Sequence, residues 1–523
     1  MRTNVHHLLE QRARSHPGTP ALTSNANTIS YEQLWAQTRG AAAGLLRLGV
    51  TREQRVAVYL EKRIETVAAI FGASAAACVF VPVNPVLRAA QVRHIVDDCE
   101  VTVLVTSPER LAVLRDQISD CPTLEHVVLV DTLAAPDDPS TGYAVHAWAG
   151  LCTSAEGEVG PSGVIDLDIA AILYTSGSTG KPKGVVLSHR NLIVGAESVA
   201  EYLGNTADDV VLAALPLSFD AGLSQLTTAF SVGAHVVLMN YLRPAEVPRL
   251  CARHGVTGLT CVPPLWLQIA EQHWPPEATA SIRYFANTGG RLPKQTLDKL
   301  RGHFPHAQPF LMYGLTEAFR STYLDPSEVD RRPASIGKAI PNAEILVVRP
   351  DGSPCDPGED GELVHRGPLV ALGYWNDPAR SAARFRPVPG RQNDWRTEEI
   401  AVWSGDTVFA DEDGFLYFVG RTDDMIKTSG YRVSPTEIEE VAYATGRVLG
   451  AVAIGIDDEG LGQRVLLVVT PVDVDGFDTE ALVADLRRQL PLYMLPSVVV
   501  WKEIPRSPNG KFDRAHLREA LGP

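Results

Sequence analysis

The chain has 523 residues, more than one ordinary hydrophobic core accommodates, so two or more domains are predicted. Its 45% hydrophobic and 21% charged residues are typical of a soluble globular protein. With 62 acidic against 47 basic residues and no long basic run, the net charge of −15 argues against nucleic acid or an anionic membrane as the main partner.

Helical and strand patterns alternate through the first two thirds of the chain. Residues 5–49 show helical spacing, with Leu34, Ala41, Leu45 and Leu48 at successive intervals of seven, four and three residues. Further helices are expected over residues 64–77, 89–98, 191–202, 223–231 and 264–272, and strands over residues 56–60, 79–83, 101–106, 169–173, 210–215, 236–239 and 256–262. Such alternation predicts parallel sheets covered by helices. Residues 132–163, rich in Ala, Pro, Asp, Ser and Gly, are expected to form a surface excursion.

The pattern changes in the last third. Short strands separated by Asp-Gly and Pro-Gly turns are expected over 344–348, 361–365 and 414–418, which favours an antiparallel, barrel-like subdomain. About 100 residues of mixed helix and strand follow a polar joint at residue 420, enough for a separate small domain. We therefore predict an α/β fold with an N-terminal domain over 1–420, built of parallel αβ subdomains plus the barrel-like subdomain, and an α+β domain over 421–523.

The cysteines and the apolar runs of the sequence indicate where in the cell the protein is located. The seven cysteines are scattered and include no CxxC pair, which fits a reducing cytoplasm and neither a disulfide framework nor a zinc site. The first 20 residues lack the apolar core of a signal peptide. The longest apolar run, residues 67–83, is shorter than the roughly 20 residues of a spanning helix and contains Gly72 and Pro82. We expect a buried helix leading into a strand there, and a cytoplasmic protein without membrane insertion.

A glycine-rich loop follows the apolar strand pattern at 169–173. Residues 174–184 hold three glycines, four hydroxyl residues and two lysines. Glycines let backbone N–H groups turn inward and hydroxyls add donors, so such a loop suits a polyphosphate. It is not a Walker loop, because Lys181 is followed by Pro182 where that motif places Ser or Thr. A flexible Gly/Ser hairpin is the alternative interpretation.

The order of residues in this loop resembles the phosphate-binding loop of the ANL superfamily of AMP-forming adenylating enzymes, which includes acyl-CoA synthetases, peptide-synthetase adenylation domains and luciferases. The resemblance covers essentially the full length and returns at several motifs in the family's order. It implies an ATP-phosphate site formed by Thr175, Ser176, Gly177, Ser178, Thr179, Gly180 and Lys183.

Three further motifs carry the resemblance at the expected nucleotide site. In the segment 313–317, Tyr313 can stack on a purine, Thr316 can donate to phosphate and Glu317 can supply a hard oxygen ligand to Mg²⁺. By resemblance, Asp406 grips the ribose hydroxyls, and residues 287–291 lie under the adenine and along the acid pocket. The nucleotide site implied in this way also contains Gly289, Gly290, Arg291, Gly314 and Arg421.

The segment 420–433 resembles the family's joint between the large and small domains. Asp423 matches the hinge about which the small, mobile domain rotates, and Lys427 and Gly430 match positions beside the pantetheine channel. Near the C-terminus, a Ser-Pro-Asn-Gly turn presents Lys511, which resembles the lysine that reaches the active site for adenylation. With Glu317 and Thr175, it completes the expected catalytic set.

The function implied is an AMP-forming acid–thiol ligase. It uses ATP and Mg²⁺ to convert a carboxylic acid to an acyl adenylate plus pyrophosphate, and then transfers the acyl group to CoA or the phosphopantetheine of a carrier protein. Two alternatives are an enzyme that adenylates amino acids, such as β-amino acids, to load a carrier protein, and a non-catalytic nucleotide-binding protein. The segments 312–324 and 335–348 are most similar to stand-alone ligases associated with exosortase-A systems, with β-amino-acid-adenylating enzymes near.

The acid pocket is expected to contain Phe219, Asp220, Gly222, Thr288, Gly289, Ala318, Phe319 and Arg320. Asp220 occupies the position that pairs with the substrate ammonium in amino-acid-adenylating relatives, Gly222 is expected to leave room, and Phe319 to wall an apolar side chain. Alternatively, Arg320 neutralises Asp220 and no substrate amine is needed. The acid, the thiol acceptor and the oligomeric state stay open.

Overall fold

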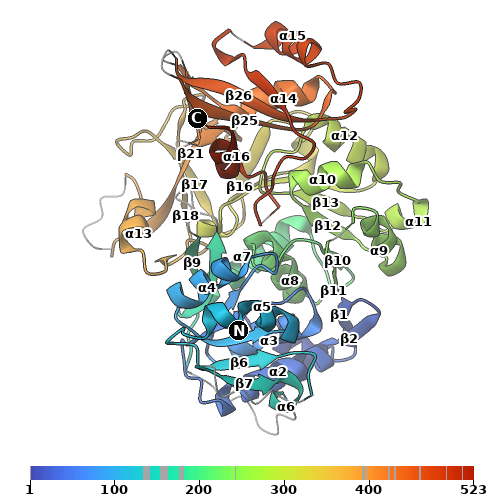
Figure 1. Cartoon of the computed structure of the whole chain (residues 1–523), viewed down its shortest axis with the longest axis vertical. Helices are drawn as coiled ribbons and strands as arrows, with labels where there is room; N and C mark the ends of the chain where they lie inside the picture. Colours follow the sequence, from blue (N-terminus) through green and yellow to red (C-terminus); the bar gives the residue numbers. More distant parts are fainter. Residues whose placement is uncertain are drawn as a thin grey trace.

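The computed structural model describes residues 2–133, 142–152, 163–175, 182–241, 243–390, 395, 397–421, 424–428, 431–458, 461–490, 492–508 and 510–522. Three sheets organise these residues. Figure 1 shows the smallest sheet, with its helices α14 (Pro435–Ala444) and α15 (Thr479–Gln489), at one end of the long axis and strands β6 (His126–Leu129) and β7 (Ala144–Ala147) at the other. None of the helices in the described ranges is long and apolar enough to cross a membrane.

The eight-stranded sheet has the order β19-β9-β8-β4-β3-β5-β6-β7. Its other strands are β3 (Arg55–Val58), β4 (Val79–Pro82), β5 (Val101–Thr106), β8 (Ile169–Thr175), β9 (Lys183–Ser188) and β19 (Gly373–Tyr374). All six residues of β5 are buried, as expected for a central parallel strand covered on both faces. The associated helices are α2 (Tyr31–Arg47), α3 (Ile64–Ala75), α4 (Ala89–Asp98), α5 (Pro108–Ile118) and α6 (Trp148–Leu151).

A fourteen-stranded sheet changes from parallel to antiparallel pairing at β14. The parallel half contains β1 (Pro20–Ser24), β10 (Val210–Ala213), β11 (His235–Leu238), β12 (Gly258–Cys261), β13 (Tyr284–Asn287) and β14 (Gln308–Tyr313), with β2 (Asn27–Ser30) as an antiparallel edge. Its helices are α1 (His7–Ser15), α7 (His189–Leu203), α8 (Asp220–Val232), α9 (Glu246–His254), α10 (Pro263–Ala270), α11 (Pro276–Thr279) and α12 (Lys294–His303).

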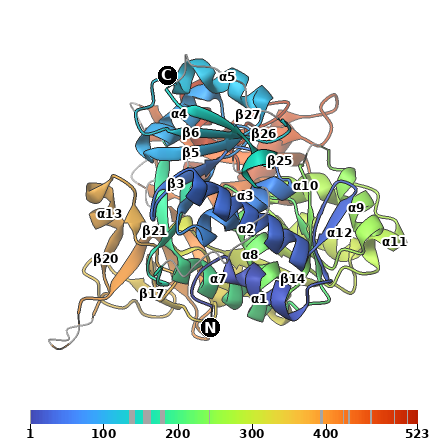
Figure 2. The same ribbon diagram turned by 90° about the horizontal axis from the view of Figure 1, so that it is seen from below.

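The antiparallel half extends the same sheet. It contains β15 (Thr322–Leu324), β16 (Ser335–Ala339), β17 (Glu344–Val348), β18 (Gly361–Arg366), β20 (Phe385–Pro387), β21 (Ile400–Ala410) and β22 (Leu416–Arg421), with 3₁₀ turns η1 (Thr316–Ala318) and η2 (Pro326–Glu328). Figure 2 shows β17, β20, β21 and helix α13 (Pro378–Arg384) on one flank, opposite α9, α11 and α12.

The five-stranded sheet lies beyond the polar joint. It contains β23 (Ile426–Thr428), β24 (Tyr431–Val433), β25 (Val448–Asp458), β26 (Gly462–Pro471) and β27 (Ser497–Val500), followed by helix α16 (Arg514–Leu521), with η3 (Leu492–Met494) before β27. Its apolar face packs against α14 and α15 through Ile438, Leu482 and Leu486. Figure 1 shows this sheet against the side of the large domain that carries α10 and α12.

The α/β alternation is confirmed, and two expectations need correction. Residues 5–49 are not helical throughout, because the hairpin β1–β2 separates α1 from α2; Leu22 pairs in parallel with Val236 of β11, a partner that local spacing does not reveal. The antiparallel strands form no closed barrel in the described part of the chain, because they extend an open sheet through β16 and β15. The expected run at 67–83 is confirmed as helix α3 and strand β4.

Candidate active site

The expected acid and nucleotide segments meet at one edge of the large sheet. Strands β10, β12, β13 and β14 are parallel, so their carboxyl ends lie at the same edge, where open α/β sheets bind ligands. Asp220 begins α8 after β10, residues 287–291 follow β13, and Tyr313 ends β14. Three segments separated by up to about 100 residues are thus brought together by topology.

Glu317, expected to bind Mg²⁺, is buried beside Lys183. The ammonium of Lys183 donates to Glu317 Oε1 at 2.9 Å and to the hydroxyl of Tyr374 at 2.8 Å. The Tyr374 hydroxyl donates to the same carboxylate oxygen at 2.6 Å. Tyr374 comes from β19 and pairs with Val185 of β9, two residues after Lys183. The three side chains form a compact polar cluster at the joint between the two large sheets.

The Glu317 carboxylate is held ionised by its surroundings. Burial alone would raise its pKa, but the charges of Lys183 and Arg384 and the hydrogen bonds from Tyr374 and Lys183 lower the pKa of Glu317 to about 2. At neutral pH Glu317 is therefore ionised, and the ammonium of Lys183 balances its charge within the cluster.

The donors present fit a magnesium-bound nucleotide. Mg²⁺ prefers hard oxygen ligands and typically takes one or two carboxylates together with substrate phosphates and water. Glu317 supplies an ionised carboxylate, and the hydroxyl oxygen of Thr175, at the end of β8, is buried and lacks a hydrogen-bond partner among the described residues. A buried hydroxyl with unused bonding capacity at this place suits a polar ligand.

Tyr313 and Asp406, expected at the adenine and ribose, are bonded to each other. The hydroxyl of Tyr313 donates to Asp406 Oδ2, which ties the end of β14 to strand β21. Asp406 is 8% exposed and lies opposite Arg421 in the pairing of β21 with β22. The structure therefore places the backbone of Arg421, the last residue of β22, next to the expected ribose carboxylate.

Lys511 reaches the same sheet edge from the C-terminal region. It belongs to a turn in which the Ser507 N–H donates to the Lys511 carbonyl at 2.7 Å and Arg506 bridges to Phe512. The Lys511 ammonium lies 5.3 Å from the centre of the Phe219 ring. A Cβ atom added to Gly289 would be 2.9 Å from Lys511 Cε, so this side chain lies directly against residue 289. The lysine thus joins the expected nucleotide segment to the expected acid segment.

Asp220 and Arg320 form a buried ion pair. Arg320 Nη1 donates to Asp220 Oδ2 at 3.0 Å, and the two residues are 3% and 2% exposed. Asp220 Oδ1 and Arg320 Nε have no hydrogen-bond partner within the described ranges. A small cavity beside the pair is lined by Arg320, Ala221 and polar and apolar residues of α7, α8, β10, β12, β13 and β14.

Other residues expected in the acid pocket have clear packing roles. Phe319, with φ of 58°, is fully buried, and its ring packs against Gly195 of α7. A Cβ atom added to Gly222 would be 1.9 Å from the Pro216 carbonyl oxygen, so backbone takes the space that its missing side chain leaves. Thr288 and Ala318 are buried next to these segments.

Several predicted positions lie outside the described residues: Ser176, Gly177, Ser178, Thr179, Gly180, Asp423 and Gly430. Lys427 is placed by its backbone within β23. Arg291 pairs with Glu440 of α14, across the boundary between the large domain and the C-terminal sheet. Gly314 follows β14 directly, and Gly290 lies three residues after the end of β13.

Sequence reasoning missed Tyr374, which closes the Lys183–Glu317 cluster, and Asn84, which contacts the turn that carries Lys511. The Nδ2 of Asn84 donates to the Pro508 carbonyl at 2.6 Å. Tyr374 lies in a Gly-Tyr-Trp-Asn stretch with no chemical motif of its own, and Asn84 precedes a proline in an ordinary turn pattern. Only the three-dimensional pairing reveals either role.

The fold and this site define the class of adenylate-forming enzymes. The family model described as AMP-binding enzyme matches residues 9–375, and the one described as AMP-binding enzyme C-terminal domain matches residues 437–511. The chain belongs to the AMP-binding enzyme family, which confirms the resemblance to AMP-forming ligases.

Relatives with both kinds of thiol acceptor are similar along nearly the full length. An L-proline–[L-prolyl-carrier protein] ligase of Streptomyces coelicolor is 33% identical over 98% of this chain and 96% of its own length. An indoleacetate–CoA ligase of Aromatoleum aromaticum is 30% identical over 98% and 97%. Among solved structures, the o-succinylbenzoate coenzyme A synthetase of Bacillus subtilis, in complex with ATP and magnesium ion, aligns with a TM-score of 0.81, 26% identity and 99% coverage of both chains.

Proposed function

We propose that this chain is an AMP-forming acid–thiol ligase whose C-terminal lysine, Lys511, acts in adenylation. The observation that carries the proposal is the position of Lys511 between Gly289 and the Phe219 ring, at the sheet edge that also holds the buried carboxylate Glu317. A single lysine from the C-terminal region, placed between the expected nucleotide segment and the Phe219 ring of the expected acid segment, is suited to bridging two reactants.

The first half-reaction activates the acid. A carboxylate oxygen attacks the α-phosphorus of ATP, the bond to the bridging oxygen breaks, and pyrophosphate leaves. Lys511 stabilises the charge that develops between the carboxylate and the α-phosphate, and Lys183, Thr175 and the backbone of residues 176–180 bind the phosphates. Magnesium, when bound by Glu317, supplies charge neutralisation and orientation of the triphosphate.

The second half-reaction transfers the acyl group. A pantetheine thiol, of CoA or a carrier protein, attacks the acyl carbonyl, loses its proton, and AMP departs. We propose that the domains divide at residues 420 and 421, that rotation about Asp423 withdraws Lys511 after adenylation, and that Lys427 and Gly430 then border the thiol channel. Support comes from the end of the large sheet at Arg421 and the start of the five-stranded sheet at Ile426.

The substrate acid carries no ammonium group beside Asp220. The Asp220–Arg320 pair is electrically neutral and buried, so an added ammonium would leave one uncompensated positive charge out of water, which is costly. Two atoms of the pair, Asp220 Oδ1 and Arg320 Nε, are buried without a hydrogen-bond partner in the described residues. They could bond a neutral hydroxyl or carbonyl group on the acyl chain.

The setting of the enzyme is a reducing compartment, and we propose the cytoplasm. All seven cysteines are free thiols, and five of them are buried. Burial raises the pKa of Cys78, Cys99, Cys121 and Cys251 to about 12, so these thiols stay protonated and unreactive.

Pyrophosphate exchange tests the function directly. The purified full chain is assayed with ATP, Mg²⁺ and labelled pyrophosphate against palmitate, benzoate, indole-3-acetate, L-proline and β-phenylalanine. Acid-dependent exchange, followed by thioester formation with CoA or pantetheine, is expected for at least one amine-free acid. Nucleotide binding without exchange for any acid would overturn the proposal in favour of a non-catalytic nucleotide-binding protein.

A further inference from the structure

The turn that carries Lys511 is anchored to the large domain by one buried amide. Asn84 follows β4 and is 5% exposed. Its Nδ2 donates to the Pro508 carbonyl at 2.6 Å, and its Oδ1 accepts from the Val86 N–H at 3.1 Å. Because the backbone N–H can only donate and the carbonyl can only accept, these two bonds fix the orientation of the amide.

This anchor acts close to the reactive lysine. Pro508 lies three residues before Lys511 in a turn closed by the Ser507 N–H donating to the Lys511 carbonyl and by the Gly510 N–H donating to the Ser507 carbonyl. Gly510 has φ of 82°, a conformation that favours glycine, so the turn has a defined shape. Fixing the Pro508 carbonyl therefore fixes where the arm bearing Lys511 begins.

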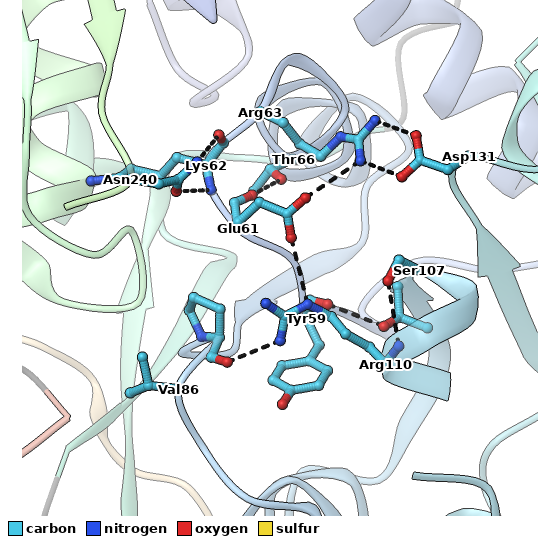
Figure 3. A network of polar contacts seen from close by, with 12 residues as sticks. Tyr59, Glu61, Lys62, Arg63, Thr66, Val86, Ser107, Arg110, Asp131 and Asn240 are labelled. Carbon is cyan, nitrogen blue, oxygen red and sulfur yellow. Dashed lines mark hydrogen bonds and ion pairs between the residues drawn. The ribbon is translucent and has the colours of Figure 1, made fainter. Parts of the chain in front are cut away.

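The backbone that follows Asn84, residues 85–87, is bonded to other parts of the large domain. Figure 3 shows the contacts of Arg110, one of the two residues that bind it. Arg110 Nη1 donates to the Pro85 carbonyl at 2.9 Å, and the guanidinium lies 4.7 Å from the centre of the Tyr59 ring. The Tyr59 hydroxyl donates to the Leu87 carbonyl at 2.8 Å. The backbone on either side of Val86 is thereby tied to Tyr59, which directly follows β3, and to Arg110 of helix α5.

A chain of charges supports Arg110 in turn. Arg110 Nε lies 3.5 Å from Glu61, whose carboxylate is also 3.4 Å from Arg63, and Arg63 donates to Asp131 at 2.7 Å (Figure 3). The hydrogen bonds to Asp131 and Glu65 and their charges raise the pKa of Arg63 against the opposing effect of its burial. The network thus supports the backbone next to Asn84, the residue that contacts the turn carrying Lys511.

We propose that Asn84 is a positioning residue for the adenylation half-reaction: its amide holds the Pro508 turn so that Lys511 is aimed at the sheet edge. This inference rests on the proposed function of Lys511. Asn84 does not touch the reacting atoms; it acts through the turn. Because thiol transfer is proposed to take place after Lys511 is withdrawn, the anchor is needed in the first half-reaction and is dispensable in the second.

The sharpest variant is Asn84→Asp. It keeps an oxygen to accept from the Val86 N–H but replaces the donor with a second oxygen that faces the Pro508 carbonyl, so the anchor becomes repulsive. Pyrophosphate exchange, measured with the panel acid that wild type uses best, is expected to fall about tenfold or more, since a lost hydrogen bond with an unsatisfied partner has that effect. The rate at which pantetheine cleaves the corresponding synthetic acyl adenylate is expected to stay within about twofold of the wild-type rate.

The chain offers a matched control. Asn240 makes the same two kinds of bond, accepting from the Lys62 N–H at 2.8 Å and donating to the Lys62 carbonyl at 3.0 Å (Figure 3). Among the described residues it makes no hydrogen bond to the turn that carries Lys511. Asn240→Asp removes the same chemistry elsewhere in the large domain. It is expected to leave the ratio of the two half-reactions unchanged.

A double-mutant cycle separates positioning from a structural effect. In a Lys511→Ala background, Asn84→Asp is expected to cause no further loss of exchange, because the group it positions is gone. Equal loss of both half-reactions, undiminished exchange in Asn84→Asp, or a full additional loss in the Lys511→Ala background would each overturn the inference. Absence of exchange in wild type for every panel acid would instead overturn the proposed function on which it depends.

Discussion

Lys511 and Gly289 lie so close together that a Cβ atom at residue 289 would displace the lysine side chain. A Cβ atom there would be 2.9 Å from Lys511 Cε and 3.2 Å from Val262 Cγ1, and Gly289 has φ of 75°. The backbone conformation therefore favours glycine at residue 289, and the absence of a Cβ atom lets the lysine, from a region more than 200 residues away, lie against it.

Gly289→Ala is expected to impair adenylation selectively. The substitution adds about 1 kcal/mol of left-handed backbone strain and forces the lysine side chain to move. Pyrophosphate exchange should fall at least tenfold, with thiolysis of a supplied acyl adenylate nearly intact. Gly255→Ala is the control, because Gly255 has φ of 60° with open space around it and lies at the end of α9. If both variants lose exchange equally, strain and not the contact with Lys511 is responsible.

Lys511→Ala is expected to separate the two half-reactions more strongly. Removing a positioned charge from a desolvated transition state typically costs about 3–4 kcal/mol, which corresponds to a loss of roughly 10²–10³ in the rate of exchange. Thiolysis of a supplied acyl adenylate should persist, since the lysine is proposed to be withdrawn in that step. Equal loss in both assays would show that Lys511 has a general binding or structural role.

The pH dependence of stability should report the Glu317 cluster. The pKa of Glu317 is lowered to about 2, so its contribution to folding is fully present above the usual glutamate pKa and is lost as the pH falls from about 5 towards 2. A shift of this size corresponds to a contribution on the order of 3 kcal/mol. Urea unfolding should show that Glu317→Gln loses less stability than wild type between pH 6 and pH 3. The difference in the free energy of unfolding should approach the contribution given above.

Glu197→Gln provides the comparison for this measurement. Glu197 pairs with Arg2 at 3.3 Å on the surface, and its side chain is 49% exposed, so screening by water keeps its contribution small. The free energy of unfolding of Glu317→Gln could instead depend on pH in the same way as that of Glu197→Gln and wild type. That result would contradict the assignment of an ionised, strongly stabilised carboxylate at residue 317.

Local patterns predicted the alternation of strands and helices because buried parallel strands are continuous apolar runs, as β5 illustrates. They did not predict β1, because its pairing partner β11 lies more than 200 residues away. The same limit hid Tyr374 and Asn84: Tyr374 bonds residues 57 and 191 positions distant, and Asn84 a carbonyl 424 positions distant. Gly222 shows a different limit, since a glycine expected to enlarge a pocket is required by the backbone of Pro216.

The Asp220–Arg320 pair leads to a prediction about stability as well as substrate. Asp220→Ala leaves the buried Arg320 without its partner, and such a loss typically costs about 3–5 kcal/mol. Replacing both, as Asp220→Leu with Arg320→Met, removes both charges together and should recover most of that loss. Urea unfolding of the two variants and wild type measures the difference, and full stability of Asp220→Ala would show that the pair is not coupled.

The same pair decides between amine-free and amino acids. Wild type should catalyse pyrophosphate exchange better with 3-phenylpropanoate than with 3-amino-3-phenylpropanoate, because the added ammonium would enter a site whose one carboxylate is already neutralised by Arg320. The Arg320→Met variant should shift this preference toward the amino acid, since it leaves Asp220 to pair with the substrate. A wild-type preference for the amino acid that disappears in Asp220→Ala would refute the amine-free assignment and make Asp220 the partner of the substrate ammonium.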